Sequence, residues 1–215
     1  MSLQINKDTK LFGSFSANPG SNGCLFFNNA FQRYGINAIY KSFYSTNIVE
    51  TIQAVKHLKF GGFALSMPLK TAVIDHLDEL DTAATRIGAV NTIVIDDNGR
   101  LIGYNTDWIG VKNFIKTNLP FIPKSITILG TGGFSRAIQY TCKNMGIDFR
   151  IIGRNEWGCV SELEGCIINA TPVPNITTRG TLIDGIPTTM NGKLISLFQA
   201  ADQFKLYTGI EYEES

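Results

Sequence analysis

The sequence lacks the charge pattern of a nucleic-acid-binding protein. Its 19 basic residues are balanced by 18 acidic ones, which gives a formal net charge of +1. The basic residues are scattered among the acidic ones, so there is no basic stripe to displace counterions from a phosphate backbone. We therefore expect no nucleic-acid partner.

Long apolar runs are also missing. No stretch approaches the roughly 20 apolar residues that a membrane-spanning helix requires. Residues 1–8 lack the apolar core of a signal peptide. We therefore expect no membrane partner and a cytoplasmic location.

Metal-binding patterns are absent as well. The sequence has 4 cysteines and 2 histidines, and none of them form a C-x-x-C pair or a Cys–His set at ligand spacing. This predicts no metal site. It also predicts free thiols, as in a reducing compartment.

What remains is an ordinary globular composition, with 44% hydrophobic residues in a chain long enough for one large domain or two small ones. In the first half, strand-like runs alternate with runs of helical apolar spacing. This alternation predicts an α/β unit with a parallel sheet. The expected strands are 10–16, 38–43 and 60–65, and the expected helices are 25–34, 46–57 and 69–80.

A hairpin and a domain boundary follow. The apolar runs 90–95 and 101–104 flank Asn98-Gly99, a strong signal for a tight turn between antiparallel strands. A helix is expected over 106–119, and the prolines just after it mark the start of a second domain.

The densest chemistry lies between Phe63 and Asp107. Three strand-like pieces end in polar groups that include Ser66 with Lys70, then Asn91, then Asp107. If these ends converge, they supply groups that bind a polyol and move a proton. The alternative for each is structural, because a lysine after proline is often solvated and Asp107 can simply begin a helix.

A glycine-rich turn opens the second domain. The buried strand 125–129 runs directly into it, and a helix follows to about residue 145. Gly130 permits a tight turn, Gly132 lets the backbone approach a pyrophosphate, and the helix N-terminus offers free N–H groups. A tight turn without a ligand is the alternative. The candidate cofactor residues here are Gly130, Thr131, Gly132, Gly133, Phe134 and Ser135.

The next strand bears on the choice of dinucleotide. It ends in Gly153 and Arg154, without the acidic residue that binds the ribose hydroxyls of NAD. An arginine can grip a 2′-phosphate, so this tip favours NADP over NAD. Glu156, two residues later, argues in the opposite direction.

Taken together, these motifs resemble the shikimate dehydrogenase family. The resemblance implies a two-lobed α/β fold, with a substrate-binding domain (1–105, completed by a C-terminal helix, 193–215) and a shortened Rossmann NADP-binding domain (106–192). The matching motifs are Ser66–Lys70, Ala89–Thr92, Asn105–Asp107, Asn169–Pro172 and the segment Phe198–Gly209.

The resemblance also implies an activity. The family transfers a hydride between NADPH and 3-dehydroshikimate, a cyclohexene carboxylate, and some relatives act on quinate. Lys70 and Asp107 would form the catalytic pair. By the same resemblance, Ser21, Ser66, Asn91 and Gln199 would bind substrate, and Arg154, Asn169 and Thr171 would join the glycine-rich turn at the cofactor. A monomer and a homodimer are both compatible with the sequence.

The chain departs from the family pattern in two places. The family's Ser-x-Ser-Pro loop, which holds the substrate carboxylate, reads Ser21-Asn22-Gly23-Cys24 here, and Ser66 replaces a threonine. The segment after Arg154 is also close to the minimum for a βαβ crossover. Three alternatives stay open: a shikimate dehydrogenase, a dehydrogenase for quinate or an amino analogue, and a non-catalytic ligand- or NADP-binding homologue.

Overall fold

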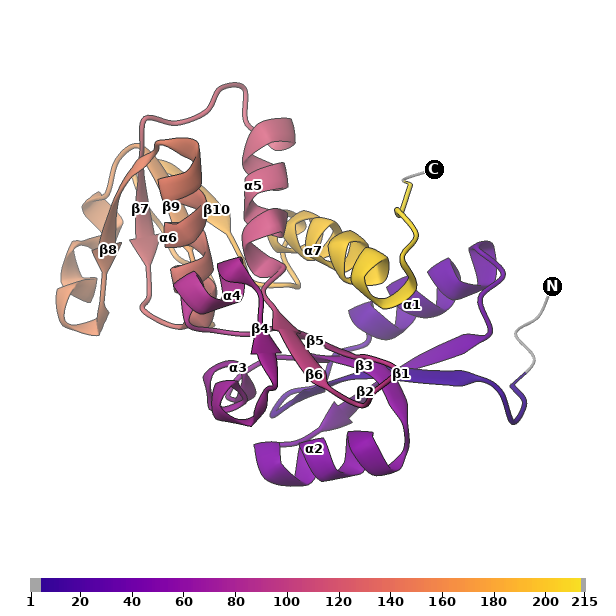
Figure 1. Cartoon of the computed structure of the whole chain (residues 1–215). Coiled ribbons are helices and arrows are strands. Elements are labelled where there is room, and N and C mark those ends of the chain that lie inside the picture. Colours follow the sequence, from indigo (N-terminus) through magenta and orange to yellow (C-terminus); the bar gives the residue numbers. More distant parts are fainter. Residues whose placement is uncertain (1–4, 214–215) are drawn as a thin grey trace. The chain divides into compact units, whose positions relative to one another are not determined.

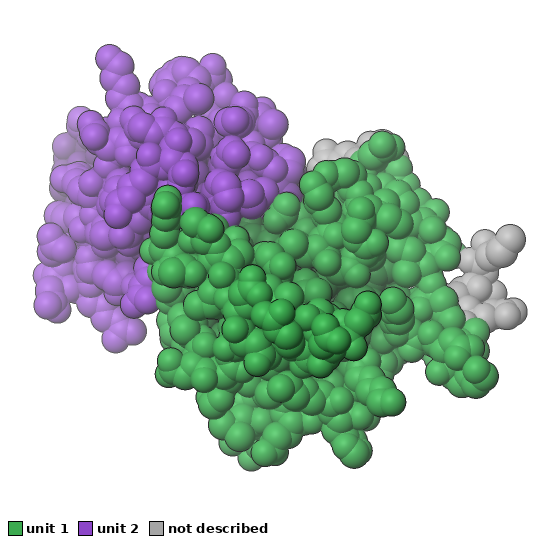
Figure 2. Space-filling model, in the orientation of Figure 1, with its two compact units in different colours: residues 1–106, 200–215 green, residues 107–199 purple. Residues whose placement is uncertain are grey.

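The computed structural model describes residues 5–213. The chain divides into two compact units (Figure 2). Unit 1 comprises residues 1–106 and 200–215, and unit 2 comprises residues 107–199. The second boundary falls inside the last helix, α7, which spans Met190–Thr208.

Unit 1 is built on a six-stranded sheet with the order β2-β1-β3-β5-β6-β4 (Figure 1). β1 pairs in parallel with both β2 and β3, which confirms the predicted parallel unit. The sheet then becomes mixed, because β5 runs antiparallel to β3 and the turn at Gly99 folds β6 back against β5 in antiparallel register. The strands are β1 Lys10–Ser16, β2 Ala38–Tyr44, β3 Phe60–Leu65, β4 Glu79–Leu80, β5 Thr92–Ile95 and β6 Leu101–Tyr104.

The helix predicted over 69–80 was wrong. α3 covers only Leu69–Ala72, a 3₁₀ turn η1 follows at Ile74–His76, and the chain then becomes strand β4. The carboxylate of Asp78 accepts a hydrogen bond from the Leu101 amide at 2.7 Å. β4 then pairs with β6, so contacts distant in sequence override the helical spacing.

The other helices of unit 1 have recognisable ends. α1 spans Asn22–Arg33, α2 spans Ile48–His57 and α4 spans Thr82–Ile87. The Asn47 side chain caps α2, and the Asp81 carboxylate caps α4 by accepting from the Ala84 amide at 2.7 Å.

The sheet of unit 1 is buried on both faces. One apolar cluster gathers around Phe63 and Val55 of α2. The other packs Phe12 against α1 and the end of α7, through Phe31 and Phe204. Burial on both faces explains why β3, with the sequence FGGFAL, carries no polar side chain.

Unit 2 contains a four-stranded parallel sheet with the order β10-β9-β7-β8. The predicted strands at β7 and β8 are present, as are the predicted helices α5 and α6. β10 and the 3₁₀ segment η2 were not predicted. The elements are α5 Asp107–Asn118, β7 Ser125–Leu129, α6 Gly133–Met145, β8 Asp148–Ile152, η2 Arg154–Glu162, β9 Cys166–Asn169 and β10 Thr181–Asp184.

In unit 2, the connection between β8 and β9 is short. A 3₁₀ segment, η2, stands where a crossover helix would join β8 to β9, and its Val160 packs with Leu129 and Ile152. A 3₁₀ segment rises about 2 Å per residue, so it covers the crossover with fewer residues than an α-helix.

Within residues 5–213, no helix combines the length and apolar character needed to cross a membrane. The same part of the chain contains no group of three or more His, Cys, Asp or Glu side chains able to hold a metal ion.

Candidate functional site

A buried polar network joins the ends of β5 and β6 in unit 1. The Asn91 Oδ1 accepts from the Thr106 amide at 2.8 Å and from the Thr92 hydroxyl at 2.9 Å. The Asn91 Nδ2 donates to the Thr106 hydroxyl at 3.0 Å. The three residues are 1% exposed or less. The second and third motifs therefore meet at Asn91.

The lysine motif lies beside this network. The Val90 amide donates to the Lys70 carbonyl at 2.8 Å, and the Leu65 amide donates to the Asn91 carbonyl at 2.8 Å. Lys70 lies in the first turn of α3 and is partly exposed, and Ser66 just before it is exposed. Backbone hydrogen bonds thus bring Lys70 and Asn91 to the same edge of unit 1.

Asp107 opens the second unit. It is the first residue of α5, is 2% exposed, and directly follows Thr106 of the buried network. A carboxylate at this position is stabilised by the positive end of the helix. Lys70 belongs to unit 1 and Asp107 to unit 2.

Gln199 lies on α7, where this helix packs closely against α5. A Cβ added to Gly110 would lie 2.6 Å from the Ile195 carbonyl oxygen and 3.1 Å from the Gln199 Cβ. Only a glycine permits this approach. It places Gln199 beside the first turns of the helix that Asp107 begins.

The loop that departs from the family pattern lies at the start of α1. Ser21 is exposed, and its carbonyl accepts from the Leu25 amide at 3.0 Å. The Cys24 thiol lies 3.4 Å from the Ser42 hydroxyl, which accepts from the Ser14 hydroxyl at 3.0 Å. The missing proline has thus been replaced by a thiol that continues a chain of hydroxyl groups.

The glycine-rich turn has the backbone that a dinucleotide needs. Gly130 has φ +103°, and a Cβ on it would lie 2.7 Å from the Thr171 Cγ2. A Cβ on Gly132 would meet no atom within 4 Å, so space is open where α6 begins. No side chain caps that helix, which leaves N–H groups for an anion. Ser135 is fully buried, as close packing of the helix on the sheet requires.

The end of β8 presents both an arginine and an acid. Arg154 is exposed at the start of η2, and the Glu156 Oε2 lies 3.4 Å from the Gly153 amide that donates to it. Both charges are therefore close to the strand tip at which the ribose of a bound dinucleotide would lie.

Asn169 has mainly a structural place at the end of β9. Its Nδ2 donates to the Asp184 carboxylate at 3.0 Å and to the Val173 carbonyl at 3.1 Å. Its Oδ1 accepts from both the amide and the hydroxyl of Thr171. Asn169 therefore fixes the loop that places Thr171 against Gly130. Asp184 had no signal in the sequence.

One residue of the network was missed by sequence reasoning. Gln203 is 2% exposed, and its Nε2 donates to the Thr92 hydroxyl at 2.7 Å. It lies one helical turn after Gln199, which was the glutamine singled out by motif. The i, i+4 spacing of two glutamines on one helix was the available signal.

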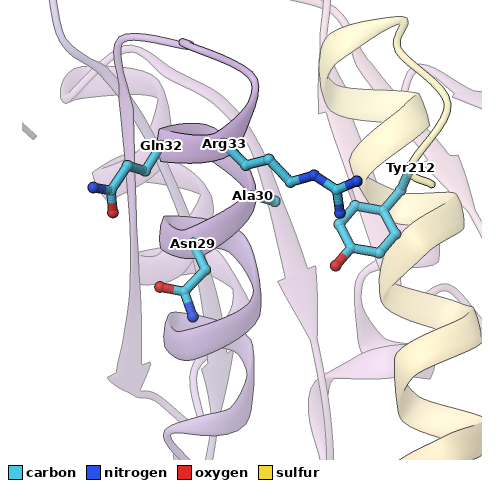
Figure 3. A pocket seen from close by; sticks show the side chains of 5 residues that line it. All are labelled: Asn29, Ala30, Gln32, Arg33 and Tyr212. Carbon is cyan, nitrogen blue, oxygen red and sulfur yellow. The ribbon is translucent and has the colours of Figure 1, made fainter. Parts of the chain in front are cut away.

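A surface cavity of about 490 Å³ lies elsewhere on unit 1, between α1 and the C-terminal segment (Figure 3). The Arg33 side chain extends across it toward Tyr212, and its Nη1 donates to the Glu213 carbonyl at 2.8 Å. No predicted site residue lines this cavity, which is bordered by Asn29, Ala30, Gln32, Arg33 and Tyr212.

The fold and these sites define a class of protein. It has a mixed α/β substrate unit followed by a Rossmann-type unit whose glycine-rich turn suits a dinucleotide. The model of the shikimate dehydrogenase substrate binding domain matches residues 20–93. A shikimate dehydrogenase (NADP(+)) of Aquifex aeolicus is 32% identical over 197 residues, which cover 90% of this chain and 71% of the relative. The chain belongs to the shikimate dehydrogenase family.

One further relative and two solved structures show the range of similarity. The shikimate dehydrogenase-like protein of Haemophilus influenzae is 38% identical over 152 residues, or 70% of this chain. A crystal structure of shikimate dehydrogenase from Aquifex aeolicus superimposes with a TM-score of 0.85 at 27% identity, covering 98% of this chain and 96% of that one. Another solved shikimate dehydrogenase, with a TM-score of 0.75 and 27% identity, covering 97% of this chain and 93% of that one, is in complex with NADP+.

The matched region spans only part of some relatives. It covers 56% of the Haemophilus influenzae protein and 44% of a shikimate dehydrogenase (NADP(+)) of Bacillus cereus. The chain thus spans about half the length of these two curated relatives.

Proposed function

We propose that this chain is an NADP-dependent oxidoreductase that interconverts 3-dehydroshikimate and shikimate, or a close cyclohexene-carboxylate analogue. The observation that carries the proposal is the junction of motifs in unit 1. The Val90 amide donates to the backbone carbonyl of Lys70, and the Thr106 amide donates to the Asn91 side chain, which supports a site that combines a lysine with a polar amide. A proposed division into a substrate domain (1–105 with 193–215) and a cofactor domain (106–192) accompanies it.

Within this proposal, the chain's groups have separate roles. Lys70 gives a proton to the carbonyl oxygen as the carbon accepts a hydride, and it recovers the proton in the reverse direction. Asp107 orients Lys70 and the reacting hydroxyl. Asn91, with Ser21, Ser66 and Gln199, holds the remaining polar groups of the substrate.

NADP, when bound, supplies or accepts the hydride. The open N-terminus of α6 would hold its pyrophosphate, and Arg154 would hold the 2′-phosphate through charge-assisted hydrogen bonds. The fit rests on the space at Gly132 and on the uncapped helix end.

The test compares wild type with Lys70→Ala, and Lys56→Ala on the exposed surface of α2 serves as the control. NADPH formation is followed with shikimate and with quinate. In this direction Lys70 accepts the proton, and loss of such a general acid–base group lowers turnover by about 10²- to 10⁴-fold, while KM changes much less. Unchanged turnover in Lys70→Ala would reject Lys70 as the proton donor.

One observation favours a substrate other than shikimate or quinate. Gly23 stands where the family pattern has the second hydroxyl of the carboxylate loop. A wild-type protein that binds NADP but oxidises neither acid would support a substrate with a different group at that position. Failure to bind NADP at all would support the non-catalytic homologue.

A further inference from the structure

We propose that Gln203 is a positioning residue that fixes the amide of Asn91 through the hydroxyl of Thr92. The inference deepens the proposed function, because it rests on Asn91 as a substrate-binding residue. Gln203 lies on α7 and is 111 residues further along the chain than Thr92. Its amide and the hydroxyl of Thr92 are both buried within unit 1.

The direction of the chain of hydrogen bonds is set at its backbone end. The Thr106 N–H can only donate, and it lies 2.8 Å from one side-chain atom of Asn91. That atom must therefore be the amide oxygen. The Thr92 hydroxyl, 2.9 Å from the same oxygen, must then give its hydrogen to Asn91.

Gln203 completes this pattern. Because Thr92 gives its hydrogen to Asn91, its oxygen is left as an acceptor for a donor on the other side. The Gln203 Nε2, at 2.7 Å, is that donor. Reversal of the Gln203 amide would place two oxygens against each other in a buried site, which is unfavourable.

The consequence concerns the substrate. The Asn91 oxygen accepts from Thr106 and from Thr92, so a contact of Asn91 with a substrate falls to its nitrogen, which also donates to the Thr106 hydroxyl at 3.0 Å. A nitrogen donor binds both a carbonyl oxygen and a hydroxyl oxygen, so the same contact serves the ketone and the alcohol. Gln203 thus keeps Asn91 in the orientation that suits both directions of the reaction.

The decisive variant is Gln203→Glu, which keeps the size of the side chain and replaces the donor by a carboxylate. Gln203→Met is the second variant, because it keeps the volume without burying a charge. Gln53→Glu, on the exposed surface of α2, is the matched control. We expect Gln203→Glu and Gln203→Met to raise the KM for shikimate by about tenfold, the cost of a misdirected buried hydrogen bond.

Other readouts separate positioning from simple loss of structure. A purely structural role would lower the active fraction and leave KM unchanged. The affinity for NADP+, measured by calorimetry, is expected to stay the same in all three variants. In a Thr92→Val background, Gln203→Met should have no further effect on KM, because the connecting hydroxyl is already gone. Thr92→Ser keeps the hydroxyl and should retain the wild-type KM.

The network can also be tested without turnover. The side-chain amide protons of Asn91, assigned by their loss in Asn91→Asp, are expected to exchange with water faster in Gln203→Met than in wild type. If the wild-type protein is inactive but exchange is still faster in Gln203→Met, the proposed function is rejected and the positioning role of Gln203 stands. Unchanged exchange, or an unchanged KM in a folded Gln203→Met protein, would overturn the inference.

Discussion

The ring of Tyr40 lies directly against Gly23. A Cβ added to Gly23 would be 3.0 Å from the Tyr40 Cε1 and 3.5 Å from its hydroxyl oxygen. Tyr40 has little room to retreat, because it is stacked on Phe27 with ring centroids 4.3 Å apart and an interplanar angle of 16°. The loop therefore accommodates glycine where the family pattern has a serine.

Gly23→Ala and Gly23→Ser test this packing. Both add a Cβ against Tyr40, so we expect each to lower the unfolding free energy by about 1–3 kcal/mol in urea denaturation. Gly23→Ser also restores a hydroxyl. If the loop binds the substrate carboxylate, the serine variant should have a KM for shikimate several-fold below that of the alanine variant. Equal KM values would show that this position does not contact the carboxylate.

Gly110→Ala tests the close contact between α5 and α7. An alanine in an exposed helix interior usually stabilises by up to about 1 kcal/mol relative to glycine. Here the added Cβ would lie 2.6 Å from the Ile195 carbonyl oxygen, so the helices must separate. We expect a loss of about 1–3 kcal/mol, measured by thermal unfolding. Gly20→Ala, whose Cβ would meet no atom within 4 Å, is the control. A Gly110→Ala protein as stable as wild type would contradict the contact.

Much of the fold follows from local patterns. Apolar strands alternating with helices predicted the parallel pairing of β1 with its neighbours, and Asn98-Gly99 predicted the β5–β6 hairpin. The segment after Leu69 was not predictable in this way. Its apolar spacing fits a helix, but Asp78 and β4 form their hydrogen bonds with β6, which a helical pattern does not reveal.

The candidate site was predictable to a similar extent. Short motifs singled out Lys70 and Asn91, and the structure ties their segments together through backbone hydrogen bonds. Gln203 was missed because its role depends on a contact across 111 residues. The hydrogen bonds that the Asn169 side chain makes with Asp184 and Thr171 could not be predicted either, because they also depend on the fold. A sequence motif identifies which side chains belong to a site, whereas the direction of their hydrogen bonds depends on neighbours that only the fold brings together.

The thiols of unit 2 predict a loss of stability in alkaline solution. Burial raises the pKa of Cys142 to about 12 and that of Cys166 to about 11. In the unfolded chain these thiols ionise near pH 9, so proton loss favours unfolding above that value. The stability that comes from burying the neutral thiol of Cys142 is complete below about pH 9, and it is lost as the pH rises toward 12.

Denaturation midpoints measured across this range should fall in wild type and fall less steeply in Cys142→Ala. Cys159 is exposed and serves as the internal reference, since it should react with a thiol reagent in the folded protein. Reaction of Cys142 at the same rate as Cys159 in native protein would contradict its burial.

The tip of β8 predicts how the chain distinguishes two dinucleotides. If NADP binds as proposed, Arg154 faces a phosphate of about −1.5 to −2 charge, whereas Glu156 repels it. Arg154→Ala should therefore weaken NADP+ binding by about 10- to 100-fold, with little effect on NAD+.

Glu156→Gln should strengthen NADP+ binding and weaken NAD+ binding, because the Glu156 carboxylate near the Gly153 amide can accept from ribose hydroxyls. Calorimetry on the full chain measures both ligands, with Arg179→Ala, whose guanidinium pairs with Glu162, as the control. If Arg154→Ala weakened the two dinucleotides equally, Arg154 would act on a feature they share, and the choice between them would lie elsewhere.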